Sequence, residues 1–529
     1  SRNFMEVESM SDIDVIKENV QFEQLIRESN SNCVLKDEYL IPDTHPDVQE
    51  ILTVESRPMI TSKEVVGDKI VLDGKVEYTV LYLAREEGLI INSVNYTQKF
   101  TSNIDLNQDE HKVICEAECK VEHIEAAIMN ERKILIQGIF DIDWELYKTN
   151  EFEFVKEIEG NDEVEVLKKT ETINRISANK EIELTGKSVI RVGMDKPQIS
   201  KILNCGLLLH KKEVKIVDDK IYLGCYCKLN ILYKGDDTKD IVCMEDDIYL
   251  SKEEEIPGIT ADMIPSVSFE ILDDELMLEE DDLGEVRVIN NELTVKANIK
   301  IFSQDKIDTI KDAYCPNSII GLKKEEYEVG VLQGANSSET VVKDNIQLTD
   351  TDLKPDQIIY SNATIILTDK EIMTDRIVVE GIIKADVLYK TTDEEKNISD
   401  IKAEIPFSSA LDISGASEGM KSIIRAAVEN IDAAIEGNSI AIKVNVILSG
   451  KIMDELTKEF IYDVVEEEGE KPEKKASITI YVVDEGETLW ELAKKYNTTV
   501  NDLIKINGLD ESDNIEGGQK LIIPGRAIF

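Results

Sequence analysis

Histidine, metal-type cysteine pairs and long apolar runs are all scarce in this sequence, and each scarcity excludes a class of function. Only 4 histidines occur among 529 residues, which leaves little side-chain material for general-base catalysis near neutral pH. The 8 cysteines form no CxxC pair and have no histidine nearby at zinc-ligand spacing. We therefore predict reduced thiols, no metal site and no cofactor. No apolar run approaches the roughly 20 residues of a membrane-spanning helix.

Positive charge is also in short supply. Lys and Arg total 60 against 108 Asp and Glu, for a formal net charge of -48. A general role in binding nucleic acid is excluded, because phosphate contacts need clustered Lys and Arg, and anionic membranes are disfavoured for the same reason. The acidic stretch from Asp273 to Glu285 is expected to be a solvated face or loop, or a docking surface for a basic partner. The N-terminal segment has no apolar signal-peptide core, so we expect the protein to work inside a cell.

Three segments imitate catalytic or ligand-binding motifs, and each lacks a required part. Residues 415–419 satisfy the GxSxG pattern, but no histidine follows Ser417 as the hydrolase order requires, so a flexible loop is expected. Residues 184–188 resemble the end of a phosphate-binding loop, but Glu181 replaces the first glycine and would repel phosphate. A calcium-loop spacing, in which Glu110 replaces the required glycine, is formed by Asp105, Asn107, Asp109 and Glu116. The sequence thus predicts a protein that is not an enzyme.

Local signals near the C-terminal end predict a strand, two helices and a second strand. Apolar residues at 478, 480 and 482 alternate with their neighbours as in a short strand, and a turn over 484–486 ends it. A break at residues 517–518 precedes a second strand over 520–524, which Pro524 closes at its edge.

The two helices between these strands have recognisable ends. Thr488 stands three residues before Glu491, which is the spacing of a capping box, so the first helix is expected to begin there. Thr499 and Asp502 repeat the device for the second helix, which residues 507–508 are expected to end.

This C-terminal segment closely resembles a LysM module, most clearly from Tyr481 to Tyr496 and over residues 521–524. The resemblance implies a shallow groove for N-acetylglucosamine chains between the loop after the first strand and the loop before the second. Mapped onto this sequence, the groove consists of Gly486, Glu487, Thr488, Leu489, Trp490, Asn507 and Ile515. Glu487 departs from the Asp that is usual in the family. Trp490 has two interpretations: partial packing in the core of the module, or an exposed aromatic anchor for a partner.

One β-rich pattern recurs three times ahead of this module. Its clearest strand is found at residues 75–82, 226–233 and 382–389. The Leu-Tyr pairs that end these strands stand 151 and 156 residues apart, and the alternation predicts one buried face per strand. A second motif aligns residues 121–128 with 428–435. The middle copy has drifted, since Gly224 falls one position early, and we assign its second motif to residues 293–299.

A third element supports the same repeat. Pro46 recurs at Pro197 and, more loosely, at Pro355, and short helices are expected after residues 43–46 and their counterparts. The expected fold class is mainly β, with three tandem sandwich-like repeat domains and a small C-terminal α+β domain. The expected boundaries are 11–160, 161–325 and 326–465 for the repeats, 466–477 for a charged linker and 478–526 for the LysM domain. The linker is expected to be an extended tether that lets the module search independently, with a charged loop packed on its own domain as the alternative.

The element from Pro46 to Leu52, the tandem arrangement and the acidity resemble the SPOCS repeats of endospore-coat proteins. Three such repeats ending in a LysM module resemble a clostridial family of coat morphogenetic proteins, and this resemblance covers nearly the whole chain. It implies a non-enzymatic adaptor in the mother-cell cytoplasm that binds the coat ATPase SpoIVA through its LysM domain and localises the coat around the forespore. Other coat proteins, and weak binding to peptidoglycan, are further partners that it allows.

Two other classes of function remain as alternatives. One is a peptidoglycan-binding protein of the cell wall or spore cortex, which would need export or lysis to meet its ligand. The other is a hydrolase that uses Ser417.

Overall fold

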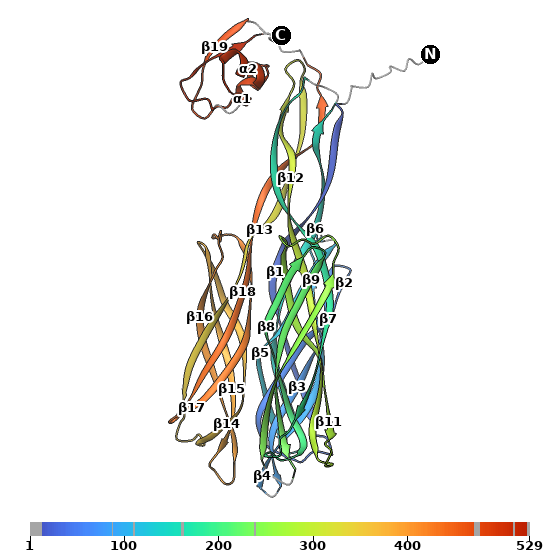
Figure 1. Ribbon diagram of the computed structural model, residues 1–529, viewed down its shortest axis with the longest axis vertical. Helices are drawn as coiled ribbons and strands as arrows, with labels where there is room; N and C mark the ends of the chain where they lie inside the picture. The colour runs from blue at the N-terminus through green and yellow to red at the C-terminus, as the bar shows by residue number, and fades with distance from the viewer. Residues whose placement is uncertain are drawn as a thin grey trace, which may run out of the picture.

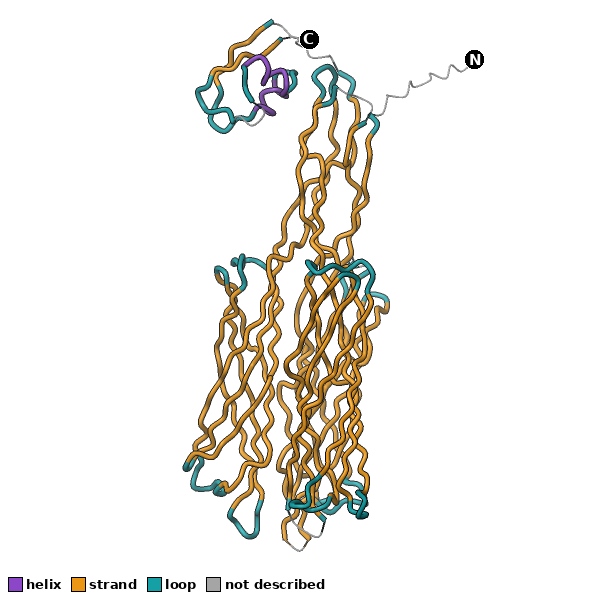
Figure 2. The backbone as a smooth tube through the Cα atoms, in the orientation of Figure 1, coloured by secondary structure: helices purple, strands orange, loops and turns teal. Residues whose placement is uncertain are grey.

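Three β-sandwiches, a stalk formed by their longest strands and a small α+β module make up the fold (Figure 1). The computed structural model describes residues 13–86, 88–108, 110, 112–159, 163–236, 240–469, 477–510 and 514–525. Strands dominate this part of the chain, and its helices are confined to the C-terminal module (Figure 2). The expected fold class is therefore confirmed.

Each repeat contains six strands. The first repeat comprises β1 (Val15–Leu40), β2 (Val48–Val66), β3 (Lys69–Glu86), β4 (Gly88–Asp105), β5 (Val113–Asn130) and β6 (Lys133–Ile158). The second comprises β7 (Glu165–Arg191), β8 (Ile199–Val217), β9 (Lys220–Gly235), β10 (Ile241–Glu255), β11 (Ile264–Glu280) and β12 (Val286–Tyr314). The third comprises β13 (Ile320–Gln347), β14 (Pro355–Met373), β15 (Arg376–Thr391), β16 (Ile398–Asp412), β17 (Lys421–Glu436) and β18 (Ser439–Glu466).

The six strands of a repeat form two antiparallel sheets of three strands that face each other across one apolar core. The sheet orders are β1–β6–β5 with β2–β3–β4, β7–β12–β11 with β8–β9–β10, and β13–β18–β17 with β14–β15–β16. Successive side chains of a strand point to opposite faces. In β3, for example, Leu72, Val76 and Tyr78 are buried in the core, whereas Lys75 and Glu77 between them lie on the outer face.

A buried tyrosine holds the turn that leads into the second strand of each repeat. The hydroxyl groups of Tyr82, Tyr233 and Tyr389 donate hydrogen bonds of 3.0, 2.9 and 3.0 Å to the backbone carbonyls of Pro46, Pro197 and Leu353. The same bond in all three copies confirms the repeat, and it shows that Leu353, rather than Pro355, is the counterpart of Pro46.

The helices expected after residues 43–46 and their counterparts are wrong. The chain makes a short turn there and enters β2 at Val48, and β8 and β14 begin in the same way at Ile199 and Pro355. The Tyr82 hydroxyl donates a hydrogen bond to the Pro46 carbonyl, and the residues that follow Pro46 pair with the central strand of the sheet instead of forming helical hydrogen bonds.

The drift of the middle copy changes which face carries an aromatic side chain. In the outer copies Gly74 pairs with Phe100 and Gly381 with Phe407, and each ring covers its glycine so closely that a Cβ there would lie within 2.7 Å of it. In the middle copy the aromatic ring over Gly224 is Tyr249, which is 50% exposed, whereas Phe100 is 7% exposed. A shift of one residue moves a side chain to the opposite face of a sheet.

The second motif of the middle copy is corrected by the structure. Residues 293–299 lie within β12, the central strand of its sheet, and β12 corresponds to β6 and β18. The counterpart of residues 121–128 is instead β11, an edge strand that carries most of the acidic stretch from Asp273 to Glu285. Most of that stretch is an exposed edge strand followed by a turn. Its many charged residues obscure the alternation of apolar and polar positions by which a strand is recognised in a sequence.

One of the expected domain boundaries lies within a strand. The expected boundary between 325 and 326 lies inside β13, which begins at Ile320. The boundary at 160 and 161 lies outside the described residues, as does residues 470–476 of the expected linker.

The stalk is built from the ends of six strands that run past the sandwiches: β1, β6, β7, β12, β13 and β18 (Figure 1). Each repeat contributes one antiparallel pair, and apolar side chains from all three pairs meet inside. Val155, Ile310 and Ile461 hold equivalent positions of the three copies and share one cluster. A neighbouring cluster consists of Val20, Phe22, Phe152, Phe154, Ile173, Ile307, Val329, Val331 and Phe460. The three copies thus surround a common axis.

Charged residues occupy this axis where the sandwiches give way to the stalk. Glu145, Lys300 and Lys451 lie on the three central strands, and their side chains are 7%, 5% and 11% exposed. Their strand partners are Glu28, Asn179 and Ala335, which follow the repeat offsets of 151 and 156 residues. Equivalent positions therefore carry one negative and two positive charges.

Glu145 is the hub of this cluster. Its carboxylate accepts hydrogen bonds of 2.7 Å from both Arg425 and Tyr147 and lies 3.7 Å from the Lys451 ammonium. Burial alone would raise the pKa of Glu145, but Lys451, Arg425 and Lys300 outweigh it and lower the pKa from 4.5 to about 2.

Acid is expected to weaken the protein through this carboxylate. Because the folded-state pKa of Glu145 is depressed, its contribution is fully present above pH 4.5 and is lost as the pH falls toward about 2. Urea unfolding of the wild type and of Glu145→Gln between pH 2.5 and 6 measures this: the difference between their unfolding free energies should shrink as the pH falls. If the difference between the two unfolding free energies did not change with pH, the lowered pKa of Glu145 would be contradicted.

Candidate binding site in the C-terminal module

The C-terminal module has the strand, helix, helix, strand order expected from its sequence. Its elements are β19 (Ile478–Val482), α1 (Leu489–Lys495), α2 (Val500–Asn507) and β20 (Lys520–Pro524). The Thr488 and Glu491 capping box is present, Thr499 caps α2, and Gly508 ends α2 in the left-handed conformation. The predicted helix ends are therefore confirmed.

The two loops expected to flank a groove lie against each other. The Val483 N–H donates to the Gln519 carbonyl at 2.9 Å, and the Gly518 N–H donates to the Val483 carbonyl at 2.8 Å. Gly517 approaches the Glu485 backbone so closely that a Cβ at residue 517 would lie 3.2 Å from the Glu485 Cα. The loop after β19 and the loop before β20 thus form one continuous surface.

Glu487 organises the loop after β19. Its carboxylate accepts a 2.9 Å hydrogen bond from the Asp484 N–H and 3.0 Å hydrogen bonds from the Tyr481 hydroxyl. The backbone hydrogen bond from Asp484 is the main cause that holds the pKa of Glu487 below its usual value. This glutamate therefore fixes the loop, and Gly486 and Thr488 on either side of it are exposed.

The other mapped groove residues differ in how accessible they are. The Asn507 amide donates to the Ile522 carbonyl and accepts from the Ile522 N–H, each at 2.7 Å, so it ties α2 to β20. Leu489 and Ile515 are half-buried against the core of the module. The exposed part of the mapped surface is therefore the loop from Gly486 to Thr488.

Trp490 faces the stalk. Its indole N–H donates a 3.0 Å hydrogen bond to the carboxylate of Asp312, near the end of β12, and its ring meets Tyr314 edge-on with 5.0 Å between ring centroids. The side chain is half-buried and also packs against the core of the module. Trp490 therefore packs partly in the core of the module, and its contacts outside the module are with the stalk of the same chain. Asp312 and Tyr314 were missed because nothing in a local pattern links residues this far apart in sequence.

The outer face of the small sheet is apolar and open. Ile478, Ile480, Val482 and Ile522 are 58%, 72%, 50% and 38% exposed, whereas Leu521 and other alternate residues point toward the helices. The alternation identified the strand correctly. Alternation could not show that the row formed by Ile478, Ile480 and Val482 points away from the helices.

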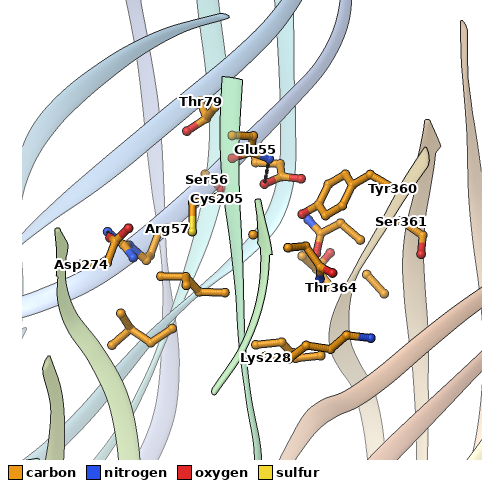
Figure 3. Close-up of a pocket in the computed structure, with 18 of the residues that line it drawn as sticks. Glu55, Ser56, Arg57, Thr79, Cys205, Lys228, Asp274, Tyr360, Ser361 and Thr364 are labelled. Atoms are coloured by element: carbon orange, nitrogen blue, oxygen red, sulfur yellow. Dashed lines mark hydrogen bonds and ion pairs between the residues drawn. The ribbon is translucent and has the colours of Figure 1, made fainter. Parts of the chain in front are cut away.

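A cavity of about 910 Å³ lies where the three repeats meet (Figure 3). On one side Arg57 donates to Glu77 and, at 2.7 Å, to Asp274 of the second repeat. On the other side Glu55 faces Tyr360 and accepts a 3.0 Å hydrogen bond from Asn204. Its lining contains no histidine among the described residues. Arg57 and Glu55 of the first repeat each contact a residue of the second, so the cavity is a polar interface between copies.

The three motif-like segments have ordinary structural roles. Ser417 lies in the loop between β16 and β17, and residues 184–188 lie inside β7. Glu110 accepts hydrogen bonds of 2.8 and 2.7 Å from Arg27, and Asp109 lies outside the described residues. Within the described part of the chain, no group of three or more His, Cys, Asp or Glu is placed to hold a metal ion.

Three tandem β-sandwich repeats and a small α+β module seated on their stalk make this a multidomain protein. The family model described as "SipL, SPOCS domain" matches residues 47–129, 198–278 and 354–436, and the LysM domain model matches residues 481–524. No solved structure matches the chain.

The chain therefore is a SipL-like protein, with three SPOCS domains followed by a C-terminal LysM domain. These domains are binding and scaffold domains, and together they are those of a sporulation-related adaptor. Among the described residues, no helix is long and apolar enough to cross a membrane.

Proposed function

We propose that this protein is a non-enzymatic scaffold of the endospore coat, which binds the coat ATPase SpoIVA through its LysM domain. In this proposal it works in the mother-cell cytoplasm, at the forespore surface, and helps to place the coat there. The SPOCS repeats and the LysM domain support the coat role. The observation that carries the protein-binding role is the exposed surface of the LysM domain.

That surface suits a protein partner. The loop from Gly486 to Thr488 is exposed and held by Glu487, and Trp490 lies at its end. The open apolar row headed by Ile480 lies on the same module. Tryptophan is enriched among the side chains that contribute most to binding at protein interfaces. We assign partner contact to Gly486, Glu487, Thr488, Leu489 and Trp490, with Asn507 and Ile515 in support.

Truncation of Trp490 tests this role. We expect Trp490→Ala to weaken binding of purified SpoIVA by the full-length protein at least about 30-fold, the effect of losing a hot-spot side chain. Trp490→Phe keeps a ring and should lose less. Biolayer interferometry gives both affinities, and urea unfolding checks that the variants are folded. Undiminished binding by a folded Trp490→Ala variant would refute the role of the loop. If Ile480→Glu alone abolished binding, the sheet face would be the contact instead.

Peptidoglycan binding is the second candidate, and the match to the LysM domain favours it. Titration of the full-length protein with N-acetylglucosamine oligomers separates the two functions. Saturable binding at micromolar concentration, with no affinity for SpoIVA, would support the wall or cortex function.

A further inference from the structure

The LysM domain is seated on the tip of the stalk by a small set of directional contacts. One carboxylate, Asp312, accepts hydrogen bonds from the Trp490 indole at 3.0 Å and from the Lys494 ammonium at 2.8 Å. The hydroxyl of Tyr314 donates a 2.7 Å hydrogen bond to the backbone carbonyl of Thr498. The seat thus engages α1 and the turn that follows it.

These contacts are buried and mutually satisfied. Tyr314 is 6% exposed and Thr498 is 2% exposed, and Tyr314 belongs to the same apolar cluster as the core of the LysM domain. Burial alone would raise the pKa of Asp312, but the hydrogen bonds from Lys494 and Trp490 outweigh it, so the pKa lies below its usual value. The carboxylate is therefore charged at neutral pH, which strengthens both of its hydrogen bonds.

Of the three central strands that extend into the stalk, β6, β12 and β18, only β12 carries this seat. Two residues after the equivalent Val155, Ile310 and Ile461 stand the acidic residues Glu157, Asp312 and Asp463. Two residues further on, the three copies carry Glu159, Tyr314 and Val465. The acidic group thus recurs in every copy, but the tyrosine is found only in the second. Tyr314 explains why the domain sits on β12, although its chain continues from β18.

The seat covers the side chain to which we assign partner binding. Trp490 cannot keep its hydrogen bond to Asp312 and its edge-on contact with Tyr314 while it inserts into a second protein. A linked domain docks on its own chain at a high effective concentration, so a few such contacts compete well with a partner in solution. Such competition lowers the apparent affinity for the partner, because only the fraction of molecules with an undocked LysM domain can bind it.

We propose that the stalk tip is an intramolecular competitor: Asp312 and Tyr314 hold the LysM domain in a docked state, and the protein partner must displace them to reach Trp490. This proposal rests on the proposed function of the LysM domain. It makes the second repeat a regulator of the module that follows the third.

Docking itself is tested without a partner. In a Trp144→Phe background Trp490 is the sole tryptophan of the 2 in the chain. We expect Tyr314→Ala to increase acrylamide quenching of Trp490 at least about twofold, because removing the ring and its hydrogen bond releases the indole. Asp463→Ala, which removes the equivalent carboxylate of the third copy, should leave quenching unchanged. Equal quenching of Tyr314→Ala and its parent would overturn the docked state.

Competition is tested by affinity for purified SpoIVA. Asp312→Ala and Tyr314→Ala should each bind about 5-fold to 10-fold more tightly than the wild type, within the usual range of coupling between sites. Asp463→Ala and Glu157→Ala are the matched controls and should bind as the wild type does. Unchanged or weaker binding by both seat variants would overturn the competition while leaving the proposed function intact. If neither the wild type nor Tyr314→Ala binds SpoIVA, the proposed function fails, and with it the competition; quenching then reports only on docking.

Discussion

Replacement of Glu145 by alanine is expected to destabilise the protein by about 3–5 kcal/mol, the typical cost of breaking a buried ion pair. The side chain is 7% exposed and is surrounded by Arg425, Lys451 and Lys300. Its removal takes away the carboxylate that these cations share. Lys300 and Arg425 keep ion pairs with Glu116 and Glu118, but Lys451, which is 11% exposed, loses its ion pair with Glu145 in a region that water reaches poorly. Urea unfolding at pH 7, monitored by circular dichroism, measures the loss.

Two control variants separate this effect from a general cost of losing a carboxylate. Glu292→Ala removes an exposed partner of Lys187, whose side chain is 72% exposed, and should cost less than about 1 kcal/mol. Glu145→Gln keeps the shape of the side chain but not its charge, so its loss of unfolding free energy should fall between those of the two alanine variants. If Glu145→Ala unfolded with the same midpoint as Glu292→Ala, the axis cluster would not contribute to stability.

The axis cluster also bears on how three similar units assemble in one order. Three identical copies would place three like charges at the positions of Glu145, Lys300 and Lys451. The mixed set instead allows attraction between the first repeat and the third, at 3.7 Å between Lys451 and Glu145. Buried ionic groups of this kind can specify pairing even where they add little stability.

The sequence predicts best what local patterns determine. The Thr488 and Glu491 capping box and the Gly508 cap act within one turn of helix, so both helices of the LysM domain could be placed from sequence. The strands of the repeats follow from alternation with period two. The repeat offsets added long-range information, because equivalent residues such as Tyr82 and Tyr233 make the same bond.

What could not be predicted depends on contacts between distant segments. The seat of Trp490 joins residues of different domains, and no local pattern encodes it. Alternation shows that Ile480 and Tyr481 lie on opposite faces of β19, but it does not show which face the helices cover. The segment after Pro46 reads as a helix start locally, yet pairing with β3 and the hydrogen bond from Tyr82 keep it extended.

Replacement of Phe460 by alanine is expected to open the stalk. The ring is fully buried, and its centroid lies 4.5 Å from that of Phe152 and 6.0 Å from that of Phe154, so the third repeat is packed here on the first. Loss of a buried phenylalanine costs about 3–5 kcal/mol, through lost transfer free energy and the cavity left behind. Hydrogen exchange followed by mass spectrometry measures where this loss appears.

Amides in the stalk portions of β1, β6, β13 and β18 should exchange faster in Phe460→Ala, while those of the sandwiches keep their protection. The reason is that each sandwich closes over its own core, whereas the stalk depends on clusters shared by all three copies. Tyr462→Ala is the control, because the Tyr462 side chain points outward from the same strand and is 37% exposed. This variant should change amide exchange little. Because Asp312 and Tyr314 lie near the end of this stalk, Phe460→Ala should also expose Trp490 to acrylamide. Faster exchange throughout the sandwiches would mean instead that stalk and sandwiches unfold as one cooperative unit.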